Sequence, residues 1–526
     1  MPITPDVVSG EIRDFVKTHE RRRRQFPKAM LVGLLAGLVA VAFRISVDRL
    51  DEARDQLITF AHTLGSWGVL LPMAFGAVGA GAGVWMVRRL APEAAGSGIP
   101  HMKAVLNRLR GMAWQRVLAV KFAAGALAIG SGLALGREGP TVQMGGAIGQ
   151  MVSKWLKATP RERRTLIAAG AGAGLAAAFN APLAGVIFVL EEMQRDFTPG
   201  VFTATFLATV VADVVARTLT GQLPTFHVAF HPVPPLASLP LFLVVGIATG
   251  VLGVAFNRAL LGSVRLFERT QRWPAWVPGA IVGGAVGLVA WFLPGAVGGG
   301  ADLVERTLAG NMALGALLAF FVLRFVLTIF SYGTGAAGGI FAPLLVLGAQ
   351  IGLAVGLLGV RYFPNAAPEP TMFAVVGMAA YFTAIVRAPL TGIVLIVEMT
   401  GNYSLMLPLL VACFCAYGVA DLLGDRPIYE ALLEHDLIRN QESPEIEGTL
   451  LLELSVEPGS PFENRRVGDL GLPVGCLIIT IQHGLRDEVA TRDSVLRAGD
   501  RITAVISPQA ASASALLREG VESARG

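Results

Sequence analysis

Apolar stretches recur along this 526-residue chain, and glycine and proline interrupt many of them. They span residues 30–43, 68–86, 117–135, 166–190, 201–215, 239–256, 277–293, 312–330, 340–360, 372–385 and 390–422. Several are too short or too interrupted to form a clean membrane-crossing helix of about 20 residues. Backbone that is broken at membrane depth is tolerated only where it is buried in protein or lines a cavity. The pattern therefore predicts an all-α polytopic membrane protein of the transporter or channel type.

The composition also indicates that most of this chain lies in a lipid bilayer. Only 15% of the residues are charged and 53% are hydrophobic, whereas soluble proteins have about 25% charged residues. The net charge of +5 does not indicate nucleic-acid binding, because Arg21 to Arg24 gather directly before the first apolar stretch. That placement predicts a cytoplasmic N-terminus. We expect a multi-pass protein of the cell (inner) membrane with both termini in the cytoplasm.

An internal repeat divides the apolar region into two related halves. The segment that runs from Ala181-Pro-Leu-Ala-Gly to Glu191 matches the segment from Ala388-Pro-Leu-Thr-Gly to Glu398 almost residue for residue. Two related halves with broken helices at matching positions predict a substrate site between the halves. The residues alone leave open whether the halves are parallel or inverted.

Three segments place glycines before a proline and a helix-compatible run: Gly96-Ser97-Gly98-Ile99-Pro100, Gly136-Arg137-Glu138-Gly139-Pro140 and Gly338-Gly339-Ile340-Phe341-Ala342-Pro343. Proline is favoured at the first helical position, where its missing N–H would be unpaired in any case. A helix N-terminus has free N–H donors and about half a positive charge, so it attracts small anions. A fourth segment, Pro427-Ile428-Tyr429, adds a phenol hydroxyl. One such segment alone would indicate only a turn before a helix, but four in one apolar chain predict an anion path.

Glu138 is the most informative single residue. A carboxylate at membrane depth costs about 2.5–3.5 kcal/mol on insertion scales, so it requires a partner or a role. An ion pair with Arg137 or Lys121 is one interpretation. The other is that the carboxylate acts as an anion mimic, blocking the anion site when deprotonated and leaving it when protonated. Glu191 and Glu192, at the end of an apolar run, are either an ordinary solvated helix end or a functional pair.

At these residues the sequence resembles the CLC family of chloride channels and chloride/proton exchangers, from about Pro27 to Tyr429. The four segments occur in the family's order, together with the connecting run from Gly174 to Gly185. The resemblance implies the CLC fold, with two inverted-repeat halves and about 17 or 18 helices, many of them partial spans. It also implies a homodimer with one pore in each subunit.

The resemblance also implies roles for residues of this chain. Ser97 and Tyr429 match the side-chain hydroxyls at a central chloride, Ile340 and Phe341 match its backbone N–H donors, and Gly98 belongs to the same site. Glu138 matches the gate, and Glu192 matches an internal proton-transfer residue, with Glu191 beside it. The expected selectivity motifs comprise Gly96, Pro100, Gly136, Arg137, Gly139, Pro140, Gly339 and Pro343. Because family channels usually lack a glutamate at position 192, we expect chloride/proton antiport rather than a passive channel.

The composition changes after residue 423. Short strands are expected at 451–456, 476–481 and 501–506, separated by turns such as Pro458-Gly459-Ser460. This region resembles a TrkA-C module, which implies a small α/β cytosolic unit that binds a small ligand or stabilises a dimer. The expected domains are a transport domain at 1–434 (halves 27–215 and 236–423, pore helix 424–434), a linker at 435–448, the module at 449–508 and a flexible tail at 509–526.

Other functional classes have weaker support. Ala95-Gly96-Ser97-Gly98 is superficially similar to a serine-protease motif, but position 95 is alanine rather than glycine. None of the seven histidines forms a His-Glu-x-x-His zinc motif. The three cysteines, Cys413, Cys415 and Cys476, are interpreted as small hydrophobic residues. We therefore expect no enzyme, no metal and no cofactor, with chloride and protons as the transported species.

Overall fold

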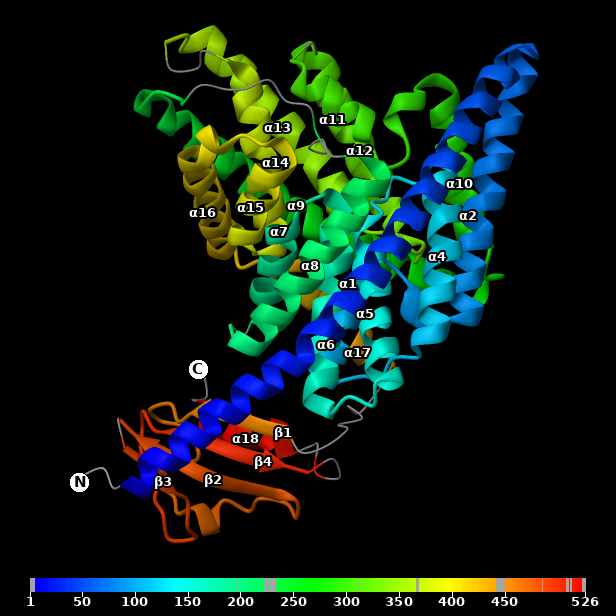
Figure 1. The fold of residues 1–526 in the computed structure, drawn as a ribbon. Coiled ribbons are helices and arrows are strands. Elements are labelled where there is room, and N and C mark those ends of the chain that lie inside the picture. Colours follow the sequence, from blue (N-terminus) through cyan, green and yellow to red (C-terminus); the bar gives the residue numbers. More distant parts are fainter. Residues whose placement is uncertain are drawn as a thin grey trace. The chain divides into compact units, whose positions relative to one another are not determined.

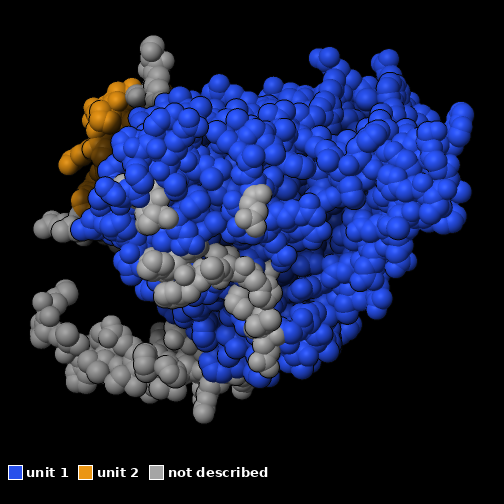
Figure 2. All heavy atoms as spheres, turned by 90° about the horizontal axis from the view of Figure 1, so that it is seen from above, with its two compact units in different colours: residues 1–106, 112–434 blue, residues 107–111, 435–526 orange. Residues whose placement is uncertain are grey.

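The computed structural model describes residues 5–195, 197–221, 226, 233–310, 312–365, 369–440, 450–484, 486–507, 510 and 513–522. It separates into two compact units, shown in different colours in Figure 2: Met1–Leu106 with Met112–Glu434, and Asn107–Gly111 with His435–Gly526. The first unit is helical and the second contains the sheet (Figure 1). The predicted fold class is confirmed.

The helices of the first unit differ widely in length (Figure 1). They are α1 (Pro5–His62), α2 (Leu70–Leu90), α3 (Ile99–Leu106), α4 (Trp114–Gly130), α5 (Glu138–Trp155), α6 (Pro160–Phe179), α7 (Pro182–Phe188), α8 (Pro199–Thr220), α9 (Leu239–Glu268), α10 (Val277–Phe292), α11 (Ala301–Leu308), α12 (Leu314–Gly333), α13 (Phe341–Tyr362), α14 (Pro370–Val386), α15 (Pro389–Thr400), α16 (Met406–Leu422) and α17 (Ile428–Asn440). Within the described residues, seven helices are long and apolar enough to cross a membrane, and others are shorter apolar helices of 10–17 residues. The expected partial spans are therefore present.

Glycine contacts explain how these helices pack so closely. A Cβ atom at Gly145 of α5 would lie 2.1 Å from the carbonyl oxygen of Gly170 on α6. The equivalent helices of the second half have the same contact, since a Cβ at Gly348 of α13 would lie 2.4 Å from the carbonyl oxygen of Gly377 on α14. Small residues at such crossings let helix backbones approach within the membrane. Glycines at these crossings therefore contribute directly to helix packing.

The two halves are inverted relative to each other. Gly136 and Gly339 form an antiparallel bridge in which each N–H donates to the other's carbonyl oxygen, at 2.7 and 2.8 Å. These residues occupy matching positions, each two residues before the first residue of α5 or α13. A reciprocal antiparallel exchange between matching residues is what a two-fold axis between the halves produces.

The second unit contains an antiparallel sheet of order β1-β4-β2-β3, with strands β1 (Leu450–Ser455), β2 (Cys476–His483), β3 (Arg486–Val489) and β4 (Arg501–Ile506). Three strands lie where the sequence predicted them, and the polar strand β3 was not predicted. The expected flexible tail is wrong for residues 513–521, which form helix α18 (Ala513–Val521). Its apolar residues Ala513, Leu517 and Val521 share one helix face and are buried in the core of this unit. Of the linker expected at 435–448, residues 435–440 instead continue helix α17, and residues 441–448 lie outside the described residues.

Candidate anion and proton site

Helices α3, α5, α13 and α17 begin at the four predicted segments. The prolines lie within or directly before the first turn rather than always at its first position, since Pro140 and Pro343 are the third residues of their helices. The first-turn N–H groups have no intrahelical acceptor, so a proline at any of these positions removes no helical hydrogen bond. Gly96 and Gly98 have φ angles of +58° and +78°, a backbone conformation that favours glycine. The four helix N-termini are therefore built as expected.

Glu138 lies between two of these helix N-termini. As the first residue of α5 it is 4% exposed, and its Oε2 accepts a hydrogen bond from the N–H of Ala342, in the first turn of α13, at 3.4 Å. The same oxygen packs against Gly136 so closely that a Cβ there would lie 2.2 Å from it. The carboxylate thus occupies the position in which an anion would meet the donors of the second half. Ile340 and Phe341, directly before and at the start of α13, are fully buried beside it.

The predicted hydroxyl groups are both fully buried. Ser97 lies against α5, since a Cβ at Gly139 would meet the Ser97 carbonyl oxygen at 2.8 Å. The Tyr429 hydroxyl has no hydrogen-bond partner among the described residues, and it lies within electrostatic range of Glu138, Glu192 and Tyr332. A buried hydroxyl without a partner is costly unless a ligand satisfies it. This geometry fits a bound anion.

The cations near Glu138 bind other groups. Lys121 Nζ donates to the carbonyl oxygens of Ala94 and Gly96, at 3.0 and 2.6 Å, which holds the backbone before Ser97 in place. Arg137 donates to Asp48 of α1 at 3.1 Å. Within the described part of the chain, neither forms an ion pair with Glu138. The ion-pair interpretation of Glu138 is therefore not supported.

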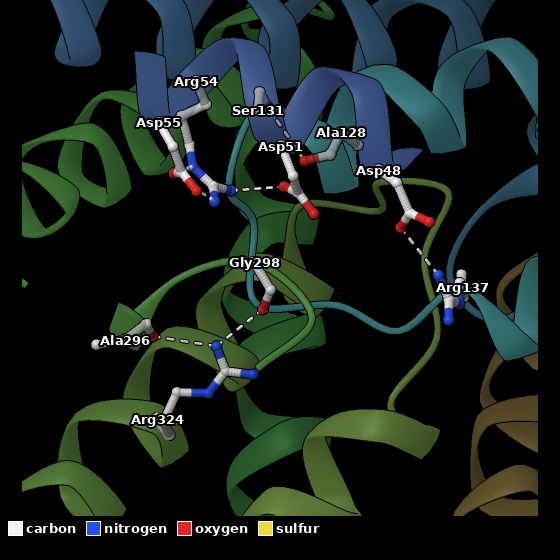
Figure 3. Close-up of polar contacts among 10 residues, drawn as sticks. All are labelled: Asp48, Asp51, Arg54, Asp55, Ala128, Ser131, Arg137, Ala296, Gly298 and Arg324. Carbon is white, nitrogen blue, oxygen red and sulfur yellow. Dashed lines mark hydrogen bonds and ion pairs between the residues drawn. The ribbon is translucent and has the colours of Figure 1, made fainter. Parts of the chain in front are cut away.

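A cavity of about 680 Å³ leads to Glu138. Its wall includes a row of charged residues on α1, and Figure 3 shows Asp48, Asp51, Arg54 and Asp55 along that helix. Arg54 pairs with Asp51 at 2.6 Å and with Asp55 at 3.0 Å. The sequence analysis missed this row, because α1 and the segment around Glu138 are far apart in the sequence and line one cavity only in the folded protein. Glu138 therefore lines the same cavity as these charged side chains.

Glu191 and Glu398 have a structural arrangement that the repeat did not reveal. Glu191 accepts hydrogen bonds from the N–H groups of Leu390 and Thr391 at the start of α15, at 3.0 and 2.7 Å. Glu398 accepts from Leu183 and Ala184 at the start of α7, at 3.1 and 2.8 Å. Each carboxylate therefore caps the helix of the other half. These contacts are those of a helix cap, and they give no support to the predicted part of Glu191 in proton transfer.

Glu192 points to a different set of partners. It is 1% exposed, and its Oε1 lies 2.7 Å from Nζ of Lys103 on α3. Lys103 also lies 3.6 Å from Glu430 of α17, and Arg195 pairs with the same glutamate. The alternative of a solvated helix end is therefore wrong for Glu192. The sequence analysis missed Lys103 and Glu430, although each is close in sequence to a predicted chloride-site residue, Ser97 or Tyr429.

The inverted halves, the partial spans and the buried helix N-termini around one carboxylate define a multi-pass membrane protein of the transporter class. The chain belongs to the CLC family: residues 77–421 match the family model described as voltage gated chloride channel. Residues 451–517 match the TrkA-C domain.

Individual relatives agree with this assignment. The chain is 44% identical over 422 residues to the H(+)/Cl(−) exchange transporter ClcA of Vibrio cholerae, covering 79% of this chain and 90% of that protein. It is 42% identical over 421 residues to the transporter of the same name from Klebsiella pneumoniae, covering 78% and 89%. Among solved structures, a slow cyanobacterial Cl−/H+ antiporter matches with a TM-score of 0.77 and 38% identity, over 80% of this chain and 99% of that one.

Proposed function

We propose that this chain is a chloride/proton antiporter. The observation that supports this most directly is the Glu138 carboxylate, buried at the paired N-termini of α5 and α13 with an N–H of α13 donating to it. A titratable group that occupies an anion site links anion binding to proton binding. The names of the relatives, which are exchange transporters and an antiporter, favour exchange over passive conduction.

The proposed cycle starts from the deprotonated gate. Charged Glu138 competes with chloride for the helix N-terminal donors, because both are anions. Protonation removes that attraction, so the side chain leaves and chloride takes its place. Ser97, Gly98, Ile340, Phe341 and Tyr429 would bind the ion through hydroxyl and backbone N–H groups.

Glu192 is the proposed group for proton transfer on the opposite side of the site. It is buried and lies, like Glu138, within electrostatic range of Tyr429. Buried carboxylates at membrane depth are typical of proton relays. Chloride and proton paths would meet at the central site and separate beyond it. Glu191 is assigned to the α15 cap in this scheme.

The setting of the protein belongs to the same proposal. It would lie in the cell (inner) membrane with both termini in the cytoplasm, as a homodimer with one pathway in each subunit. The TrkA-C domain would be cytosolic and would bind a small ligand or stabilise the dimer. No cofactor besides bound chloride is required for the proposed cycle, and the scheme includes no enzymatic step.

Reconstitution tests the proposal. Purified protein in a planar bilayer under a pH gradient should give a reversal potential that moves when either the pH gradient or the chloride gradient changes. Proteoliposomes should show proton movement driven by a chloride gradient alone. A reversal potential set by chloride alone, unmoved by pH, would instead identify a passive chloride channel.

A further inference from the structure

Lys103 is the closest charged partner of Glu192. The Lys103 side chain is 6% exposed and that of Glu192 is 1% exposed, with 2.7 Å between Nζ and Oε1. Breaking a buried ion pair by removing one partner leaves an uncompensated charge, and such a group binds or loses a proton instead. The protonation of Glu192 therefore depends on whether Lys103 is present.

The pair connects the segments of the proposed chloride site. Lys103 lies on α3, which begins directly after Ser97 and Gly98, and Glu430 follows Tyr429 on α17. Lys103 contacts both Glu192 and Glu430. One ammonium group thus joins the proposed proton-transfer residue to α17, which carries Tyr429, and to α3, the helix that directly follows Ser97.

The charges in this cluster balance only while Glu192 is deprotonated. Lys103 pairs with Glu192, and Glu430 pairs with both Lys103 and Arg195. Among the described residues, the Tyr429 hydroxyl also lies within electrostatic range of Glu192. With Glu192 charged, two cations face two anions. A proton on Glu192 leaves one net positive charge beside the helices of the chloride site.

We propose that Lys103 is a positioning residue for proton transfer. It pairs with the charged form of Glu192, so that each proton that binds there must separate this ion pair before it moves on. The proposal rests on the antiport function proposed above. It adds a second consequence, since each proton that binds at Glu192 adds positive charge near the chloride site. Proton loading and chloride binding then favour each other.

The test is the pH dependence of exchange in three variants. Chloride-driven proton movement is measured in proteoliposomes at a series of symmetric pH values, where the orientation of the protein does not matter. Lys103→Met should move the half-maximal pH upward by about one unit or more, since an opposite charge within about 4–6 Å shifts a titration by that amount. Lys103→Arg should keep the wild-type profile. Glu430→Gln should move it downward, because it removes the negative charge that opposes Lys103.

A second readout follows Glu192 directly. The infrared absorption of its protonated carboxyl group, identified by its loss in Glu192→Gln, should titrate at higher pH in Lys103→Met and at lower pH in Glu430→Gln. An unchanged titration in Lys103→Met, or a shift of the same sign in both variants, would overturn the proposal. If Lys103→Met does not fold, the sign of the Glu430→Gln shift decides. Wild-type protein that moves chloride without protons would instead overturn the proposed antiport function. The infrared titration of Glu192 would still test the Lys103 proposal in that case, because it does not require proton transport.

Discussion

The two gate segments, residues 136–140 and 339–343, have matching backbones but differ in the chemistry of their side chains. Residues 136–140 and 339–343 are joined by the Gly136–Gly339 bridge, and each segment leads into a helix two residues later. In that register Glu138 is the counterpart of Phe341. Glu138 places a carboxylate against the opposite helix, whereas the Phe341 ring packs against Phe382 with ring centroids 4.5 Å apart.

The same contrast recurs at the glutamates that end the repeated segment. Glu191 and Glu398 match in sequence and in contact, since each caps a helix of the other half. The next residue differs between the halves, because Glu192 pairs with Lys103 while its counterpart Met399 is a buried apolar side chain. In the function proposed above, the residues that break the two-fold symmetry, Glu138 and Glu192, take part in proton transfer. The symmetric pair, Glu191 and Glu398, caps helices.

The largest effect is expected where the symmetry is broken at the gate. Glu138→Gln should reduce proton movement by about 100-fold or more, because an amide of the same shape cannot titrate. Chloride flux should persist, since the amide has no charge with which to block the site. Simultaneous chloride and proton flux from reconstituted vesicles measures both.

The matched control for this variant is Glu398→Gln, which also neutralises a carboxylate in the helical unit but at a symmetric position. It should retain coupled exchange. Undiminished proton movement in Glu138→Gln would refute the gate assignment, whatever happens in the control.

The next effect is expected at the second asymmetric position. Glu192→Gln should reduce proton movement by about tenfold or more while chloride flux continues, because the proton path loses its buried carrier. The amide oxygen can still accept from Lys103, and Glu430 remains 3.6 Å from that ammonium group, so folding should be preserved. The chloride-to-proton ratio measures the effect, and a wild-type ratio would show that protons take another route.

The features of the gate segments that depend on neighbouring residues could be predicted well from the sequence. The glycines, the proline and the helix-compatible run of each gate segment are adjacent in sequence, so the helix starts and the buried position of Glu138 could be inferred before the structure. The roles assigned to Ser97, Tyr429 and Ile340 depended on the resemblance, and they remain predictions.

The contacts between distant segments could not be predicted in this way. Lys103 and Glu192 are 89 residues apart, and Glu191 lies about 200 residues from the helix that it caps. Nothing in the spacing of one segment specifies its partner in another, because the pairing depends on how the inverted halves pack. For the same reason, the repeat identifies Glu191 and Glu398 as matching residues but does not show that each caps a helix of the other half.

A smaller effect should distinguish the two bridge glycines. A Cβ at Gly136 would lie 2.2 Å from Glu138 Oε2 and 3.0 Å from the Ala342 nitrogen, whereas a Cβ at Gly339 has the Gly139 nitrogen as its nearest neighbour, at 3.1 Å. The backbone contacts therefore match, and the carboxylate contact is the difference. Gly136→Ala should displace the gate and raise the chloride-to-proton ratio several-fold, while Gly339→Ala should leave it near the wild-type value. Equal ratios in the two variants would show that Glu138 does not depend on this close contact.

The smallest functional effect is expected at the symmetric caps. Glu191→Gln and Glu398→Gln each remove a negative charge from a helix N-terminus but keep an amide oxygen that can accept one hydrogen bond. Each should lower the free energy of unfolding by about 1 kcal/mol, with similar shifts in melting temperature in detergent, and neither should change the chloride-to-proton ratio. If Glu191→Gln altered the chloride-to-proton ratio while Glu398→Gln did not, Glu191 would be a functional residue like Glu138 and Glu192. Matching contacts in the two halves would then not be sufficient to identify a residue as purely structural.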